Sequence, residues 1–287
     1  MPAAKILSVP DSIGLDVAQA CLTQGLTAHY LTHDAHAGLI KEGEWMLIHG
    51  VGSGACQWAA QMAKLKVRQI QRIPSPATFS SRQRWLRGGP LGAQGYKVIG
   101  TTSTSKAEIG AATGCDELIV LDEAPGTSYE DYTSQDIVGK VMEVTDGVGC
   151  KAVVDGIGLA TYEISLDCLA RRGIFITFGN ASGAVPAYPP LKHIGKSSFM
   201  TRPKLLDYTV DREELLSRAD DIFGWIEAGE LNVSVRPPAQ RRLGPWHPLT
   251  TMPPPPQVDK TFELAEAVQG HEYLEAGLSR GKLVYRV

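Results

Sequence analysis

Short, almost entirely apolar runs alternate with helix-forming segments through the middle of this chain of 287 residues. The runs typical of strands are Trp45–His49, Gly95–Gly100, Leu118–Leu121, Ala152–Asp155 and Ile174–Phe178. The helix-forming segments between them are Ala55–Lys64, Lys106–Thr113, Ser134–Thr145 and Tyr162–Ala170. Apolar strands joined through helices form parallel sheets that helices cover on both faces. The alternation therefore predicts an α/β fold with a doubly wound parallel sheet, the Rossmann architecture that binds dinucleotides.

A glycine-rich turn joins the first of these strands to the first helix. Gly50, Gly52 and Gly54 give the spacing GxGxG, and Ala55 stands where the full GxGxxG motif would continue. Backbone amides in such a turn can approach a pyrophosphate, and the following helix N-terminus attracts anions. We expect residues Gly50, Gly52, Ser53, Gly54 and Ala55 to bind cofactor; a tight turn without a ligand is the alternative.

The end of the second strand indicates which nucleotide is bound. NAD sites usually place a carboxylate there to bind the ribose 2′-hydroxyl. This chain instead continues through Thr101, Thr102, Ser103, Thr104 and Ser105 to Lys106, with no carboxylate before Glu108. Hydroxyl donors and an ammonium group would hold a 2′-phosphate, which a carboxylate would repel. Thr102, Ser103 and Lys106 therefore favour NADPH; alternatively, Ser105 caps the next helix and Lys106 is a solvated residue.

Composition excludes several classes of protein. The formal net charge of −3 argues against a general nucleic-acid binder. No apolar run reaches the roughly 18 residues of a membrane span, and no secretory signal core is present. The five cysteines form no CxxC pair, which fits reduced thiols in a cytoplasmic protein without a zinc site. His49, at the end of a strand, is interpreted as a packed structural residue.

Two stretches, Val67–Gln94 and Val235–Gln257, depart from their surroundings. Together they contain eight arginines and eleven of the eighteen prolines, but no lysine, aspartate or glutamate. Without them the chain has 20 basic against 31 acidic residues. Neither stretch has a helical or strand period, and prolines oppose both structures. Disordered loops or a proline-rich partner ligand would explain this composition.

Several longer segments carry a resemblance to a known family. They include PDSIGLDVAQACLTQGLTAHYL from Pro10, CLARRGIFITFGNASGAVP from Cys168 and FMTRPKLLDY from Phe199. With them the chain resembles the zinc-free, zeta-crystallin-like quinone oxidoreductases of the medium-chain dehydrogenase/reductase superfamily, fungal members above all. The resemblance implies hydride transfer from NADPH to a quinone without a metal. It also implies that Thr27 lies near the nicotinamide and that Phe178, Gly179 and Asn180 flank it, while no catalytic residue is assigned.

The resemblance also implies a domain organisation. Residues 1–40 would be a remnant of a GroES-like catalytic domain with a connecting helix, 41–234 the NADP-binding domain, and 258–287 the return to the catalytic domain. The family's N-terminal segment is expected to be missing, and 67–94 and 235–257 to be translated introns, because deleting each restores a continuous family pattern. A homodimer would form through the sheet edge at Lys196–Thr201.

Two departures from the family pattern concern the cofactor. The family's AxxGxxG turn corresponds here to Gly50, Ser53 and Cys56, and the cysteine would crowd the helix against the strand. The spacing from Ser103 to Lys106 is one residue shorter than in most members. A non-catalytic NADPH-binding remnant and an enone reductase of the same superfamily remain as alternatives to the quinone reductase.

Overall fold

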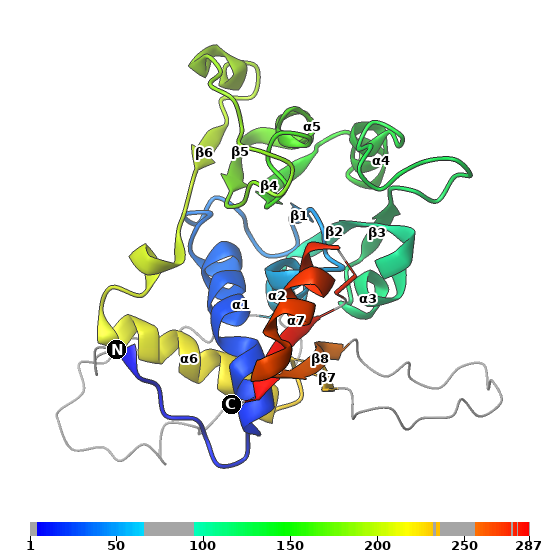
Figure 1. Cartoon of the computed structure of the whole chain (residues 1–287). Helices are drawn as coiled ribbons and strands as arrows, with labels where there is room; N and C mark the ends of the chain where they lie inside the picture. Colours follow the sequence, from blue (N-terminus) through cyan, green and yellow to red (C-terminus); the bar gives the residue numbers. More distant parts are fainter. Residues whose placement is uncertain are drawn as a thin grey trace, which may run out of the picture.

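A six-stranded parallel sheet forms the centre of the protein (Figure 1). The computed structural model describes residues 5–65, 95–231, 234–235, 256–276, 278–279 and 281–286. The strands are β1 (Trp45–Ile48), β2 (Lys97–Thr102), β3 (Glu117–Val120), β4 (Cys150–Asp155), β5 (Leu169–Thr177) and β6 (Phe199–Thr201). Their order, β3-β2-β1-β4-β5-β6, is that of dinucleotide-binding domains. The predicted doubly wound fold is confirmed.

Helices cover both faces of the sheet, as Figure 1 shows. They are α1 (Leu15–His33), α2 (Gly54–Ala63), α3 (Ala107–Ala112), α4 (Ile137–Val144), α5 (Tyr162–Asp167), α6 (Arg212–Glu227) and α7 (Ala267–Glu275). Met46 and Ile48 of β1 pack into one core with α1, α2 and α6, whereas Leu47 packs into the other with α4 and α5. Successive strand residues point to opposite faces, so a short apolar strand supplies both cores. Among the described residues, no helix combines the length and apolarity needed to cross a membrane.

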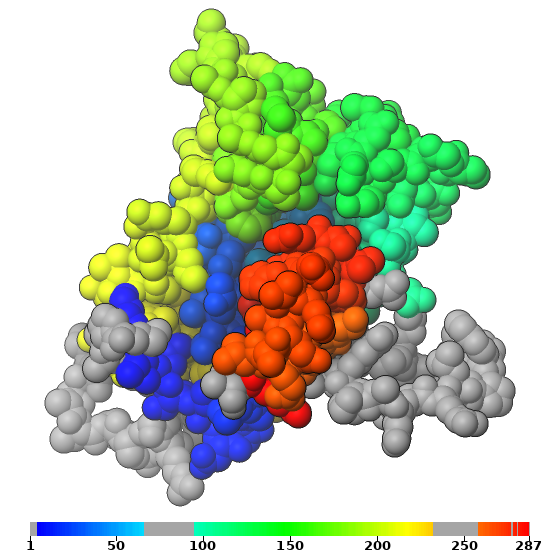
Figure 2. Space-filling model, in the orientation of Figure 1, coloured from blue at the N-terminus to red at the C-terminus, as the bar shows by residue number. Residues whose placement is uncertain are grey.

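A second, smaller sheet lies at the C-terminal end of the chain. Its parallel strands are β7 (Ser234–Val235), β8 (Pro256–Glu263) and β9 (Lys282–Arg286), in that order. Val258 and Val284 are buried together with Ala20 of α1. Figure 2 shows this orange and red segment lying against the blue helix α1. The long helix α1 therefore connects the small sheet to the core of the large one.

The start of β5 differs from the sequence prediction. The helix expected to reach Ala170 ends at Asp167, and β5 begins at Leu169 rather than at Ile174. Leu169 pairs with Cys150, and the regular register resumes only where Ile174 pairs with Ala152. Between these pairs Arg172 has a φ of +56°, which a local apolar pattern does not reveal.

The two ends of the first unusual stretch lie next to each other. The Tyr96 N–H donates to the carbonyl oxygen of Ala63, the last residue of α2, at 2.9 Å. A Cβ on Gly95 would lie 2.5 Å from the carbonyl oxygen of Lys64, so this close approach requires glycine. The segment expected as an intron, 67–94, lies outside the described residues. Its flanks nevertheless form a tight helix-to-strand connection, which is why β2 starts at Lys97 rather than at Gly95.

The flanks of the second unusual stretch are also close together. Val235, at the end of β7, pairs in parallel with Val258 of β8. Residues 236–255, which make up most of the second expected intron, lie outside the described residues. The division of the chain into domains stays a prediction.

Candidate dinucleotide site

The glycine turn lies between β1 and α2. Gly50 has a φ of +75° and Gly54 a φ of +46°, values in the left-handed region that glycine favours. The Ser53 N–H donates to the Gly50 carbonyl at 3.0 Å and its hydroxyl to the same oxygen at 3.1 Å. The Gly50 N–H donates to Thr101 Oγ1 at 3.2 Å, which ties the turn to β2. The turn therefore stands where an open parallel sheet binds ligands, past the carboxyl end of a central strand.

Gly52 brings this turn against the end of β2. A Cβ at position 52 would lie 2.5 Å from Thr102 Oγ1 and 2.7 Å from Lys106 Cβ. Ser103 is buried and shares a hydrogen bond of 3.0 Å with Ser105 Oγ. The structure thus brings together the residues expected at the pyrophosphate and those expected at the 2′-phosphate.

One part of the alternative, Ser105 as the cap of the next helix, differs from the structure. Residues Thr104–Lys106 form a short 3-10 turn ahead of α3, and Lys106 rather than Ser105 occupies the N-cap position of that helix. No side chain caps α3. Ser105 therefore does not act as the helix cap.

Asp122 is a residue near this segment that the sequence analysis missed. It follows β3, and its Oδ1 accepts a hydrogen bond of 2.5 Å from the Thr104 N–H, while its carbonyl oxygen accepts one of 3.1 Å from Thr104 Oγ1. Asp122 lies after the third strand, not at the end of the second, where NAD sites usually place a carboxylate. Because β3 pairs with β2, the end of β3 lies beside the end of β2.

Two ionisable side chains behind the turn are held uncharged. His49 Nδ1 lies 3.2 Å from Thr101 Oγ1, and Nε2 has no hydrogen-bond partner among the described residues. Burial lowers the pKa of His49 and raises that of Cys56 to about 12. The nearby carboxylate of Asp155 opposes the first shift and adds to the second. His49 is thus a buried, neutral side chain, in agreement with a structural role.

The buried carboxylate of Asp155 fixes the loop after β4. It accepts hydrogen bonds from the Ile157 N–H at 2.7 Å, the Gly158 N–H at 3.1 Å, Thr161 Oγ1 at 2.8 Å and Ser165 Oγ at 2.7 Å. Four donors compensate for the desolvation of the carboxylate, since buried charges need such partners. The loop that faces the expected nicotinamide segment is therefore rigidly held.

The expected nicotinamide segment, Phe178 to Asn180, packs closely on that loop. The Phe178 N–H donates to the Asp155 carbonyl at 2.8 Å. A Cβ on Gly179 would lie 2.3 Å from the Gly156 carbonyl oxygen, so a larger residue cannot enter without displacing backbone. Asn180 is exposed at the end of this contact. The close approach of two loops explains why glycine is needed at 179.

Helix α1 passes beside the glycine turn. Gln24 Nε2 lies 4.0 Å from where a Cβ on Gly54 would stand, and Gln24 Oε1 is buried without a partner among the described residues. Thr27 follows one helical turn later on the same face. The Thr27 hydroxyl donates to the Thr23 carbonyl at 2.8 Å. The expected position of Thr27 beside the nicotinamide stays a prediction.

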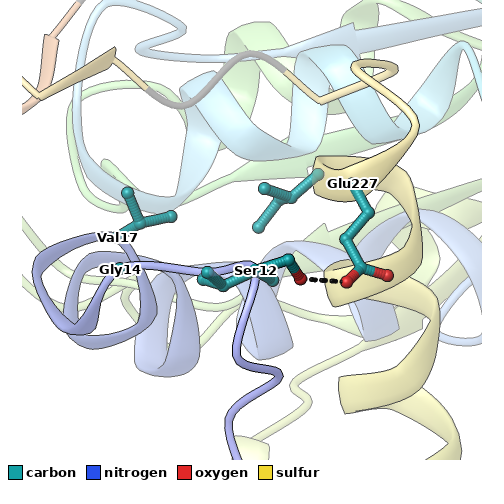
Figure 3. A pocket seen from close by; sticks show the side chains of 6 residues that line it. Ser12, Gly14, Val17 and Glu227 are labelled. Carbon is teal, nitrogen blue, oxygen red and sulfur yellow. Dashed lines mark hydrogen bonds between the residues drawn. The ribbon is translucent and has the colours of Figure 1, made fainter.

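A separate cavity of ≈340 Å³ lies between the first turn of α1 and the end of α6. The Ser12 hydroxyl hydrogen-bonds to the Glu227 carboxylate there, and the other lining residues are Ile13, Gly14, Val17 and Ile226 (Figure 3). None of the expected cofactor residues lines this cavity. No group of three or more His, Cys, Asp or Glu side chains in the described part of the chain could hold a metal ion.

Comparison with known proteins decides the family. No family model matches the chain. A quinone oxidoreductase of Pseudomonas aeruginosa is 31% identical over 287 residues, which cover 98% of this chain and 67% of that protein. The chain belongs to the quinone oxidoreductase family.

Two further known proteins are similarly close to this quinone oxidoreductase family member. A 2-haloacrylate reductase of Burkholderia is 31% identical, with 99% of this chain and 67% of that protein covered. The crystal structure of Escherichia coli quinone oxidoreductase complexed with NADPH superimposes with a TM-score of 0.73 at 28% identity. It covers 99% of this chain and 69% of the other. The family resemblance inferred from the sequence is confirmed.

Proposed function

We propose that this chain binds NADPH and transfers a hydride from it to a quinone. The contact of Gly52 with Thr102 and Lys106 carries the proposal, because it joins a pyrophosphate-binding turn to hydroxyls and an ammonium suited to a 2′-phosphate. The bound cofactor would supply the hydride, so the protein's task is orientation and electrostatics. The family's NADPH-bound structure supports the choice of cofactor.

Each part of the site has a proposed task. Backbone N–H groups of Gly52, Ser53, Gly54 and Ala55 would bind the pyrophosphate at the start of α2. Phe178 and Gly179, held against the loop after β4, would limit the space open to the nicotinamide. Asn180, exposed beside them, would lie at the edge of that space.

The test is a fluorescence titration with NADPH and NADH beside an assay of NADPH oxidation with 1,4-benzoquinone. Gly52→Ala would place a methyl group in contact with Thr102 and Lys106 and should weaken NADPH binding at least tenfold. Gly195→Ala is the matched control, since a Cβ there meets no atom within 4 Å. Equal NADPH affinity in the Gly52 variant and the control would refute the proposed site.

Turnover is a separate outcome of the same experiment. The chain spans 67% of the Pseudomonas relative, so NADPH binding without oxidation would favour the non-catalytic remnant. NADPH oxidation with an α,β-unsaturated acid but not with a quinone would favour the enone reductase. The Burkholderia relative, named a 2-haloacrylate reductase, supports this alternative.

We further propose a homodimer through β6, whose outer edge has no paired strand among the described residues. Phe199 and Met200 of this strand are exposed, as are Leu191 and Ile194 before it. An unpaired, apolar sheet edge favours association. Light scattering should show a dimer that Phe199→Glu dissociates and that Leu264→Glu, at another exposed apolar position, leaves intact.

We also infer a cytoplasmic location, from the five free thiols of a chain without CxxC pairs. We propose the division 1–40, 41–234 and 258–287, which places α1, most of β8 and β9 with the GroES-like remnant and the six-stranded sheet with the NADP-binding domain. Limited proteolysis should then release a fragment that begins near residue 41 and ends near residue 234.

A further inference from the structure

A cavity of ≈530 Å³ lies beside the carboxyl ends of β5 and β6. Thr177 and Asn180 line it from the β5 side, and Met200 and Arg202 line it from the β6 side. Val185, Tyr188 and His193, on the intervening segment, also line it. Its volume lies in the range of sites for small organic ligands.

Arg202, which lines this cavity, is anchored by two hydrogen bonds. Its Nη1 donates to the Gly179 carbonyl at 3.2 Å and approaches Thr177 Oγ1 at 3.4 Å. Both contacts use one nitrogen of a guanidinium group that carries five N–H donors in a planar fork. Of the described residues lining the cavity, Arg202 alone carries a permanent charge. The remaining N–H groups of the anchored guanidinium can therefore donate hydrogen bonds to an oxygen atom of a ligand.

Another part of the lining is aromatic and apolar. Tyr188 stacks on Tyr162 with ring centroids 5.9 Å apart and an interplanar angle of 20°. Its hydroxyl hydrogen-bonds to Met200 Sδ at 2.9 Å and lies 3.3 Å from His193 Nε2. These contacts fix a flat wall with Val185 beside it. Such a wall suits a planar ring whose charged or carbonyl oxygen faces the arginine.

The cavity adjoins the segment proposed to flank the nicotinamide. Asn180 lines the cavity, and the carbonyl of Gly179 anchors Arg202. We infer that this cavity is the acceptor site and that Arg202 gives it a preference for rings that carry a carboxylate. The inference rests on the proposed function, whose acceptor site it identifies.

Arg202 would act on the charge that develops during reduction. If a bound NADPH gave its hydride, with the electron pair, to the acceptor and became NADP⁺, negative charge would develop on the acceptor's carbonyl oxygen. The guanidinium stabilises this oxyanion through charge-assisted hydrogen bonds. One proton from solvent then completes the hydroquinone, so the reaction consumes one proton for each acceptor reduced.

Binding of product-like probes to the full chain tests the inference without requiring turnover. The probes are hydroquinone and 2,5-dihydroxybenzoate, which differ by one carboxylate, and their dissociation constants are measured by calorimetry. Wild-type protein should bind 2,5-dihydroxybenzoate at least fivefold more tightly than hydroquinone. Arg202→Met should weaken 2,5-dihydroxybenzoate binding about tenfold or more and change hydroquinone binding much less. Arg202→Lys keeps the charge but loses the planar guanidinium group, so its affinity for 2,5-dihydroxybenzoate should lie between those of the wild type and Arg202→Met.

Arg171→Met is the matched control, because it removes an exposed arginine of β5 that does not line the cavity. It should bind both probes like the wild type. No binding of 2,5-dihydroxybenzoate, or equal binding by the wild type and Arg202→Met, would overturn the inference. A parallel NADPH titration keeps the two proposals apart, since failure to bind NADPH refutes the proposed function whatever the probes show.

Discussion

Deleting Val67–Gln94 should stabilise the protein. Leu65 and Gly95 flank the 29 residues that the structure leaves undescribed after α2, and these flanks already meet through the Tyr96–Ala63 hydrogen bond of 2.9 Å. The deletion leaves Lys66 as the single linking residue. The deletion removes no contact between described residues. It lowers the entropic cost of closing the connection between α2 and β2, which grows with the length of that connection.

The size of the gain follows from loop closure. Each doubling of loop length costs about 0.6 kcal/mol, and shortening from about 30 residues to about 2 is roughly four doublings. The free energy of unfolding should therefore rise by about 2 kcal/mol. With a denaturant slope of about 2–3 kcal/mol/M, the urea midpoint should increase by roughly 0.7–1 M.

Urea unfolding followed by tryptophan fluorescence measures this shift. The control replaces 67–94 by a glycine-serine segment of equal length, which should unfold at the same midpoint as the natural chain. A lower midpoint after deletion would refute the reasoning, since it would mean that the segment contributes contacts of its own. Transcripts lacking the segment would support its origin as an intron.

Three further predictions concern the cofactor, pH and the core. Asp122→Asn keeps the hydrogen bond to Thr104 but removes a negative charge near the proposed 2′-phosphate. It should therefore raise the affinity for NADPH several-fold and leave the affinity for NADH unchanged. Equal effects on both nucleotides in a fluorescence titration would contradict this. Burial lowers the pKa of His33 to about 3, so below pH 6.5 the unfolded chain binds a proton that the folded chain cannot, and the free energy of unfolding should fall by about 2 kcal/mol between pH 7 and pH 5. A flat urea midpoint over that interval would count against it. Trp58→Ala removes a fully buried indole from the core under α1 and should lower the free energy of unfolding by about 3–5 kcal/mol, measured by the same urea experiment. A decrease below about 1 kcal/mol would mean that neighbouring side chains fill the cavity.

Much of the fold could be predicted because its strands are buried on both faces. The apolar run at Trp45–His49 and its glycine turn are local signals, and they placed β1, the turn and α2 to within a residue or two. The parallel, doubly wound type of sheet followed from general rules for apolar strands joined by helices, whereas its strand order comes from the structure. The early start of β5 could not be seen, because it depends on the pairing of Leu169 with Cys150 across the sheet.

The candidate site was predictable in part for the same reason. Gly52, Thr102 and Lys106 lie in two local patterns, and each pattern was recognisable alone. Asp122 was missed because its relevance depends on a hydrogen bond to a neighbouring strand's loop. Arg202 was missed because its anchors, Gly179 and Thr177, are more than twenty residues away in sequence.

The absence of room for a side chain at Gly52 has a consequence for redesign. Thr102 and Lys106 leave no room for a Cβ at Gly52, so the two segments that would hold the two phosphate groups are in close contact. A substitution at Thr102 intended to change the preferred nucleotide will also displace the turn. Its effect will not add simply to that of a change at Gly52, because residues in contact couple. Cofactor preference and overall nucleotide affinity are therefore not independently adjustable here, and a successful redesign would have to vary both segments together.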